Sequence, residues 1–211
     1  MRRLPVYLLV DVSGSMSGEP LEQVKNGIQM LVAALRQDPY ALETAWLSVI
    51  TFGSSADVAV PLTELTAFQP PNLAVSGSTN LGAGLKLVAD RAASELTKTT
   101  PTTKGDWKPM VFLMTDGAPD GGWQSGLTRF KQEKWGLVVC CSVDGGDEKV
   151  LMQISEVVVR LNTSDSNSIK AFFKWISASV SQGSKAVDQG GKEVQGLSEL
   201  PPPPQEIQIV T

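Results

Sequence analysis

The sequence contains no histidine among its 211 residues. Without an imidazole there can be no Ser-His-Asp or Cys-His nucleophile pair and no histidine-ligated zinc site. The chain also lacks a side chain whose ordinary pKa lies near neutrality and suits acid–base catalysis. Many common enzyme mechanisms are therefore excluded before any motif is considered.

Positive charge and cysteine are also scarce. Eighteen Lys and Arg stand against 22 Asp and Glu, a formal net charge of −4, so no overall positive field favours nucleic acid. The two cysteines, Cys140 and Cys141, are adjacent, and on a strand they would face opposite sides of the sheet. We expect reduced, half-buried thiols rather than a disulfide or a four-thiolate metal site.

Length and composition indicate one globular domain followed by a tail. With 42% hydrophobic and 19% charged residues, the chain is typical of a folded protein that does not enter a membrane. We place the domain at residues 1–184 and a Gly/Pro-rich tail at 185–211, in which Pro201–Pro204 precede a short alternating, strand-like segment. A flexible tail, or one docked on this domain or on a partner, both fit this pattern.

Apolar runs of strand length alternate with segments of helical period. Residues 4–10, 110–114 and 137–143 are almost continuously apolar, which indicates strands buried on both faces of a parallel sheet. The first run leads into Asp11 without a small-residue cleavage site, so we interpret it as a core strand of a cytoplasmic protein rather than a secretion signal.

Three helical stripes lie between and after these strands. They comprise Leu21, Val24, Ile28, Leu31 and Leu35; Leu81, Leu85, Val88, Ala92 and Leu96; and Ile169, Phe172, Phe173, Ile176 and Val180. Residues 45–52 and 57–62 are expected to form a hairpin. The predicted fold is α/β: a doubly wound, mostly parallel six-stranded sheet with one antiparallel edge strand and helices on both faces.

Oxygen-bearing side chains follow the predicted strands. Asp11, Ser13 and Ser15 come after the first strand, Asp116 ends the fourth, and residues 76–80 precede the second helical stripe. In a parallel sheet the carboxyl ends of the strands meet at one edge, where ligands bind. Carboxylate and hydroxyl oxygens without nitrogen or sulfur are the donors of a hard cation such as Mg²⁺, Mn²⁺ or Ca²⁺.

These residues carry a family resemblance. Asp11-x-Ser13-x-Ser15, a spaced Thr79 and the triplet Thr115-Asp116-Gly117 resemble the metal-ion-dependent adhesion site (MIDAS) of von Willebrand factor type A domains, over residues 4 to about 182. The compact form is similar to bacterial tellurium-resistance TerY-type proteins.

The resemblance implies a metal site and a partner. Ser13, Ser15 and Thr79 would offer hydroxyls to a divalent cation, with Mg²⁺ expected first, while Asp11 and Asp116 would hold it directly or through water. An Asp or Glu of a partner protein would take the sixth position. The implied setting is a bacterial tellurite or stress response, with a chain that is monomeric on its own and binds neither nucleic acid nor membrane.

Three further residues near predicted strand ends are candidates for a partner-binding rim: Asp120, Trp123 and Asp144. The alternative for the two carboxylates is a solvated loop position, and the alternative for the tryptophan is packing in the core. The ligand residues have structural alternatives too. Asp11 with the two serines could cap the first helix, and Thr79 could cap the helix that follows it.

An enzyme is the main competing function. A haloacid-dehalogenase phosphatase would need an acid and a threonine where Ser13 and Ser15 stand, and the Gly-rich segment 77–84 matches neither common nucleotide-binding fingerprint. Lys104 and Lys108 are poorly placed for a receiver domain. We therefore expect a metal-dependent protein-binding module that is not an enzyme, with a metal-dependent phosphohydrolase or a metal-free scaffold as alternatives.

Overall fold

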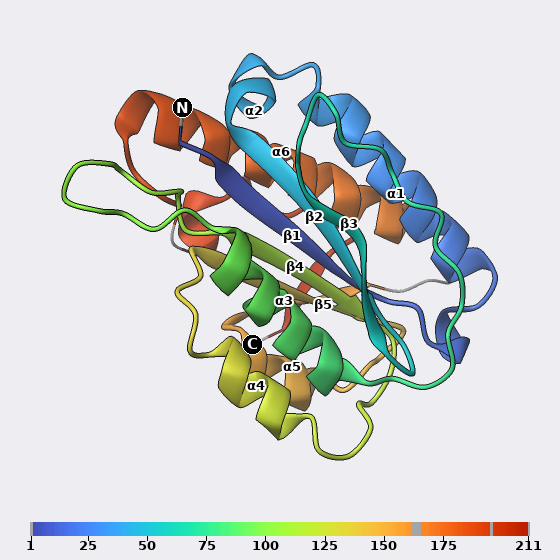
Figure 1. The fold of residues 1–211 in the computed structure, drawn as a ribbon. Coiled ribbons are helices and arrows are strands. Elements are labelled where there is room, and N and C mark those ends of the chain that lie inside the picture. The colour runs from blue at the N-terminus through green and yellow to red at the C-terminus, as the bar shows by residue number, and fades with distance from the viewer. Residues whose placement is uncertain (1, 162–165, 195, 211) are drawn as a thin grey trace.

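The computed structural model describes residues 2–161, 166–194 and 196–210, which form one sheet between two layers of helices (Figure 1). The strands are β1 Leu4–Asp11, β2 Ala45–Phe52, β3 Ala56–Glu64, β4 Met110–Thr115, β5 Leu137–Val143, β6 Val157–Leu161 and β7 Gln208–Val210. The helices are η1 Gly14–Met16, α1 Glu19–Leu35, α2 Pro39–Thr44, α3 Leu81–Glu95, α4 Gln124–Phe130, α5 Glu148–Ile154, α6 Ser166–Gly190 and η2 Leu197–Glu199.

The sheet has the strand order β3-β2-β1-β4-β5-β6-β7. Strands β1, β2, β4, β5 and β6 are parallel, as the continuous apolar runs of β1, β4 and β5 predict for a parallel sheet. The predicted hairpin is confirmed, because β3 returns antiparallel to β2 and forms one edge. The sheet has one strand more than predicted, since the short β7 pairs antiparallel with β6 at the other edge.

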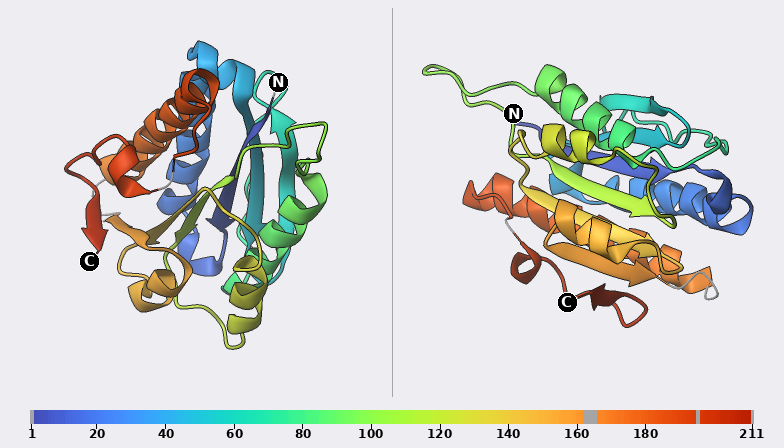
Figure 2. Two further views of the ribbon diagram at one scale, coloured as in Figure 1. Left: turned by 90° about the vertical axis from the view of Figure 1, so that its left-hand side faces the viewer. Right: turned by 90° about the horizontal axis from the view of Figure 1, so that it is seen from below.

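Each face of the sheet buries a separate hydrophobic cluster. Helices α1 and α6 cover one face, and α3, α4 and α5 cover the other, as the turned views show (Figure 2). Cys140 and Cys141 belong to opposite clusters, in agreement with strand alternation. Both thiols are fully buried, more than the half-burial expected, because helices cover both faces at β5.

Two pairs of helices approach at glycines. A Cβ atom added to Gly27 on α1 would lie 2.0 Å from Cδ2 of Phe173 on α6. One added to Gly126 on α4 would lie 2.1 Å from the carbonyl oxygen of Gly82 on α3. A side chain at either position would force the two helices apart, so these glycines fix how closely neighbouring helices pack within each layer.

The end of the chain docks on the domain. Helix α6 continues to Gly190, beyond the predicted boundary at residue 184. We call residues 191–194 and 196–210 the C-terminal strap. Its Leu200 and Ile207 are buried in the α1–α6 cluster, and Trp175 Nε1 donates a 2.8 Å hydrogen bond to the Pro201 carbonyl. Of the alternatives for the tail, docking on this domain is the one that the structure has.

No helix in residues 2–161, 166–194 and 196–210 combines the length and the apolar character that a membrane crossing requires.

Candidate metal centre

Asp11 and Thr115 lie side by side at the carboxyl ends of β1 and β4. These strands are parallel neighbours, in a register that pairs Val10 with Met114. Asp11 is the last residue of β1 and Thr115 the last residue of β4. The Thr115 hydroxyl donates a 2.5 Å hydrogen bond to Oδ2 of Asp11. The sheet itself therefore fixes this carboxylate.

Asp11 is fully buried, and both of its oxygens accept hydrogen bonds. Its Oδ1 accepts a 2.7 Å bond from the backbone N–H of Ser13, and Oδ2 accepts the bond from Thr115. Burial raises the pKa of Asp11 above the ordinary value, hydrogen bonds from Ser13 and Thr115 oppose that rise, and the charge of Asp116 adds to it. Two hydrogen bonds thus hold the Asp11 carboxyl group, and within the described residues it has no ion pair.

Two serine hydroxyls connect the loop after Asp11 to the second carboxylate of the site, that of Asp116. Oγ of Ser13 lies 3.0 Å from Oγ of Ser15, and the Ser15 hydroxyl donates a 2.8 Å hydrogen bond to Oδ1 of Asp116. Asp116 is half-buried, and its pKa is raised by burial and by the charge of Asp144, while the bond from Ser15 lowers it. Two carboxylates with raised pKa values therefore flank two hydroxyls.

The third loop is tied to the first through its backbone. The N–H of Gly14 donates to the Gly77 carbonyl at 2.8 Å, and the N–H of Ser76 donates to the Val12 carbonyl at 2.7 Å. These bonds bring Thr79 to the same edge of the sheet. A Cβ atom added to Gly117 would lie 3.2 Å from Oγ1 of Thr79, so this hydroxyl lies against the residue that follows Asp116.

The capping alternatives are wrong. Helix α3 is capped by Asn80, whose side chain accepts a 3.0 Å bond from the N–H of Ala83, and not by Thr79. Helix α1 begins at Glu19 after Gly18, whose φ of 84° lies in the left-handed region. The short turn η1 has Ser13 at its N-cap position, without a side-chain capping bond.

Two of the three predicted rim residues lie on exposed loops. The N–H of Asp120 donates to the Thr79 carbonyl at 3.0 Å, and the N–H of Asp144 donates to the Leu161 carbonyl at 3.0 Å. Trp123 is different: it is 8% exposed and packs in the cluster beneath α3 and α4. Of the two predictions for Trp123, the structure has the one in which it belongs to the core, so it offers little of its surface to a partner.

The donor set fits a hard divalent cation. In the described residues no three His, Cys, Asp or Glu side chains are grouped for a metal, so the further side-chain oxygens that Asp11 and Asp116 have beside them are hydroxyls. Five predicted ligands come from three loops at one edge: Asp11, Ser13, Ser15, Thr79 and Asp116. Such neutral oxygens with two carboxylates suit Mg²⁺, Mn²⁺ or Ca²⁺, and a cation would relieve the cost of burying the charge of Asp11 and of partly burying that of Asp116.

Sequence reasoning missed the role of Thr115. Its hydroxyl orients Asp11. Thr115 ends the otherwise apolar strand β4, and threonine is common in strands, so the sequence pattern alone does not distinguish it from a structural residue. The signal was its position next to Asp116 in the triplet Thr115-Asp116-Gly117.

Comparison with known proteins identifies the family. The model of the von Willebrand factor type A domain family matches residues 6–175. The chain belongs to this family. An uncharacterized protein of Synechocystis sp. is 34% identical to this VWA domain over 128 residues, which are 57% of this chain and 27% of that protein. The chain thus spans about a quarter of that relative's length.

Solved structures share the fold. Proximal thread matrix protein 1 from the mussel byssus has a TM-score of 0.59 at 23% identity, over 84% of this chain and 48% of its own. A von Willebrand factor type A protein from Catenulispora acidiphila has a TM-score of 0.63 at 17% identity, over 86% and 43%. The mussel protein has also been solved with a zinc-occupied MIDAS motif, at 22% identity, a TM-score of 0.59 and the same coverage.

Proposed function

We propose that this VWA domain is a protein-binding module that acts through a divalent cation and is not an enzyme. The observation that carries the proposal is the continuous set of oxygens from Ser13 through Ser15 to Asp116, beside the fixed carboxylate of Asp11. These residues and Thr79 would hold the ion, with Mg²⁺ as the first expectation and Mn²⁺ or Ca²⁺ as alternatives.

Each residue has a defined part. Thr115 and the Ser13 N–H hold the carboxylate of Asp11, and Ser15 holds that of Asp116. Two carboxylates balance the charge of a divalent cation, and the hydroxyls add no charge. A bound cation would supply a Lewis-acidic position that takes an anionic oxygen from outside the chain. The proposed ligand there is an Asp or Glu side chain of a partner protein.

The surrounding charge makes this binding depend on the cation. Asp120 and Asp144 lie exposed near the site, and the charge of Asp144 reaches Asp116. Without the cation, an approaching carboxylate would meet the negative charges of Asp116, Asp120 and Asp144, which disfavour association. A bound cation would add an attractive point for an acidic side chain beside these carboxylates.

Metal binding is tested by thermal and chemical unfolding with Mg²⁺, Mn²⁺ or Ca²⁺ against chelator. At a hundredfold excess over Kd, a bound ion raises the free energy of unfolding by about 2.7 kcal/mol. We expect Asp116→Ala to lose this gain and Ser17→Ala, an exposed serine of the same loop, to keep it. A gain of equal size in Asp116→Ala would refute the site.

The partner carboxylate is tested with Mn²⁺ as the bound ion. Water proton relaxation reports exchangeable water on Mn²⁺, so a carboxylate that displaces water lowers it. We expect a short glutamate-containing peptide to lower the relaxation, and the matching glutamine peptide to leave it unchanged. The same response to both peptides would argue against a carboxylate-binding position.

The phosphohydrolase alternative lacks a residue that it needs. Ser13 stands where a second acid would activate water or the leaving group, and Asp11 is fully enclosed by its hydrogen bonds. We expect no turnover of phosphate esters or nucleotides with Mn²⁺. Turnover that Asp11→Asn abolishes would reverse this ranking, while partner binding that survives chelator would favour the metal-free scaffold.

The biological setting is proposed on family resemblance alone. It is a cytoplasmic role in a bacterial tellurite or stress response, with a chain that is monomeric by itself. A strain that lacks the chain should be more sensitive to tellurite, and rescue should require Asp116. Equal rescue by Asp116→Ala would separate the resistance role from the metal.

A further inference from the structure

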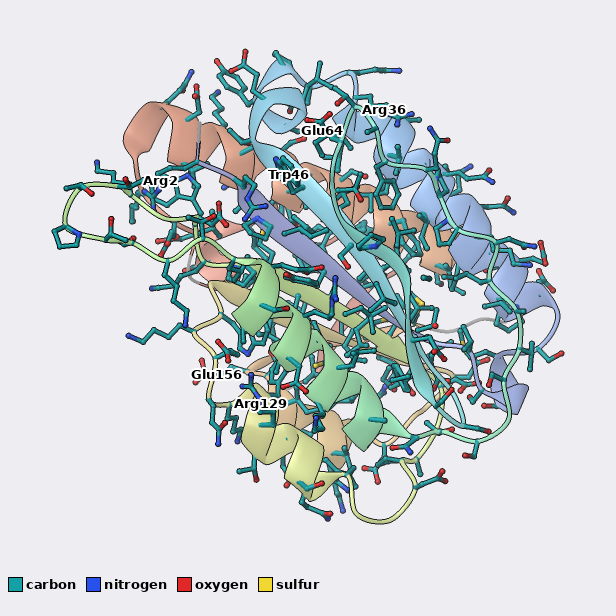
Figure 3. All side chains as sticks on the ribbon, viewed as in Figure 1. Arg2, Arg36, Trp46, Glu64, Arg129 and Glu156 are labelled. Atoms are coloured by element: carbon teal, nitrogen blue, oxygen red, sulfur yellow. The ribbon has the colours of Figure 1, made fainter. Side chains whose placement is uncertain are left out.

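A long loop projects from the end of the sheet opposite the metal centre. We call residues 97–105, between α3 and β4, the finger (Figures 1 and 2). Its base is held by the N-terminal segment: Arg2 Nε donates to the Gly105 carbonyl at 2.6 Å, and Arg3 binds both carboxylate oxygens of Asp106 at 2.9 and 2.5 Å. The side chain of Arg2 lies at this base (Figure 3). The whole connection between α3 and β4, residues 96–109, is longer than the usual connection between a helix and a strand.

A groove lies between the finger, the end of α3 and the segment before β5. We call it the finger groove; its volume is about 490 Å³. Part of its lining is apolar, from Ala93, Leu96, Trp107 and Pro109. Lysines also line it, namely Lys98, Lys108 and Lys134. An apolar surface bordered by ammonium groups suits a ligand that is both apolar and anionic.

The finger groove has more positively charged side chains than its carboxylates can pair with. Its two carboxylates are paired, Asp106 with Arg3 and Glu133 with Arg129 at 2.7 Å. Lys108 is paired with Glu193 at 3.1 Å. Within the described part of the chain, the exposed Lys98 and Lys134 have no ion pair. This local positive charge stands on a chain whose net charge is −4.

We propose that the finger groove binds an acidic segment of a partner protein, one with apolar side chains between its carboxylates. The carboxylates would pair with Lys98 and Lys134, and the apolar side chains would pack on Leu96 and Trp107. Two surplus charges are too few to hold a nucleic acid backbone against a net negative protein. The site is independent of the metal centre, so the domain makes contacts at both ends of its sheet.

The test uses a fluorescently labelled peptide of alternating glutamate and leucine, with the full chain in chelator at low salt. We expect saturable binding by fluorescence anisotropy, and none for a peptide with lysine in place of glutamate. The double variant Lys98→Glu/Lys134→Glu should weaken binding by roughly tenfold or more. The matched variant Lys170→Glu/Lys174→Glu, at exposed lysines of α6, should bind like the parent chain.

A second variant tests the apolar lining. Ala93→Glu places a charged side chain in the groove and should also weaken binding, while its unfolding midpoint shows that the fold is kept. Equal binding by Lys98→Glu/Lys134→Glu, or an equal loss in the α6 control, overturns the proposal. So does peptide binding that requires Mg²⁺, which would assign the peptide to the metal centre, or a single-stranded oligonucleotide that binds more tightly than the peptide.

Discussion

The Ser15 hydroxyl donates a 2.8 Å hydrogen bond to Oδ1 of Asp116, and 101 positions separate the two residues in the chain. The bond links the loop after β1 to the end of β4. It can form only when these two strands are paired in register. The candidate metal centre therefore assembles as part of the sheet, and its ligand geometry reports on the folded state.

The metal-free protein should lose stability as pH rises through the range above the ordinary aspartate pKa of 3.8. Burial raises the pKa values of Asp11 and Asp116, so the folded state binds protons more tightly than the unfolded chain. Asp116→Asn removes one ionisation and should reduce this fall. The free energy of unfolding, measured by urea from pH 4 to 7 in chelator, gives the comparison.

Asp90 provides a control of opposite sign. Its bonds from Lys86 and Arg129 lower its pKa, so it adds stability above pH 3.8 that is lost as pH falls through its folded pKa. Asp90→Asn should not reduce the loss of stability that occurs as pH rises. If Asp116→Asn and Asp90→Asn change the pH dependence of the free energy of unfolding in the same direction, burial of Asp116 is not the cause of the stability lost at higher pH.

Gly126→Ala should destabilise the fold by about 1–3 kcal/mol, because the added methyl group would meet the backbone of Gly82. Gly82 lies in the first turn of α3, the helix that follows Thr79, so the affinity for Mg²⁺ should fall as well. Urea unfolding and calorimetric titration measure the two effects. Gly121→Ala in the preceding loop, where nothing lies within 4 Å, should change neither.

Ile207→Ala in the strap should cost roughly 2–5 kcal/mol, since the side chain is 5% exposed and packs in the α1–α6 cluster. Ile209→Ala, two residues later, should cost less than about 1 kcal/mol, because Ile209 is 40% exposed. Urea unfolding of both variants measures the difference. Equal small losses would mean that the strap does not contribute to the core.

Both cysteines should be unreactive in the folded protein. Burial raises the pKa of each thiol, and each side chain is fully enclosed. A thiol reagent such as dithionitrobenzoate should label neither residue under native conditions and both in urea. Rapid labelling of one cysteine in the native protein would show that β5 opens locally.

Sequence patterns predicted the parts of the fold in which burial is periodic. The stripe from Leu21 to Leu35 is buried along α1, and the continuous apolar runs became the parallel strands. The positions of Asp11, Thr79 and Asp116 were also foreseeable, because residues that follow parallel strands, or precede the next helix, share one edge. Their function as ligands stays a prediction.

Features set by contacts between distant segments could not be predicted in this way. The buried strap residues Val194 and Leu200 follow no helical or strand period, and the strand-like alternation around Ile207 does not say which surface covers it, so only packing on the domain reveals their role. The sequence left Trp123 between the rim and the core, and the close contact between Gly82 and Trp123 at the start of α4 places it in the core. Such contacts depend on how closely two helices approach, which no single segment encodes.

Main-chain hydrogen bonds hold the loops around the candidate metal centre, and we call these bonds the frame. The groups that hold the loops are therefore different from the side chains that a partner would contact. Gly14 to Gly77, Asp120 to Thr79 and Asp144 to Leu161 are all backbone contacts. The exposed side chain of Asp120 can thus be exchanged while the frame remains, whereas Asp144, with a φ of 50°, lies in the left-handed region that favours Asp, Asn or Gly. A new binding preference can therefore be selected or engineered at this rim without rebuilding the site beneath it.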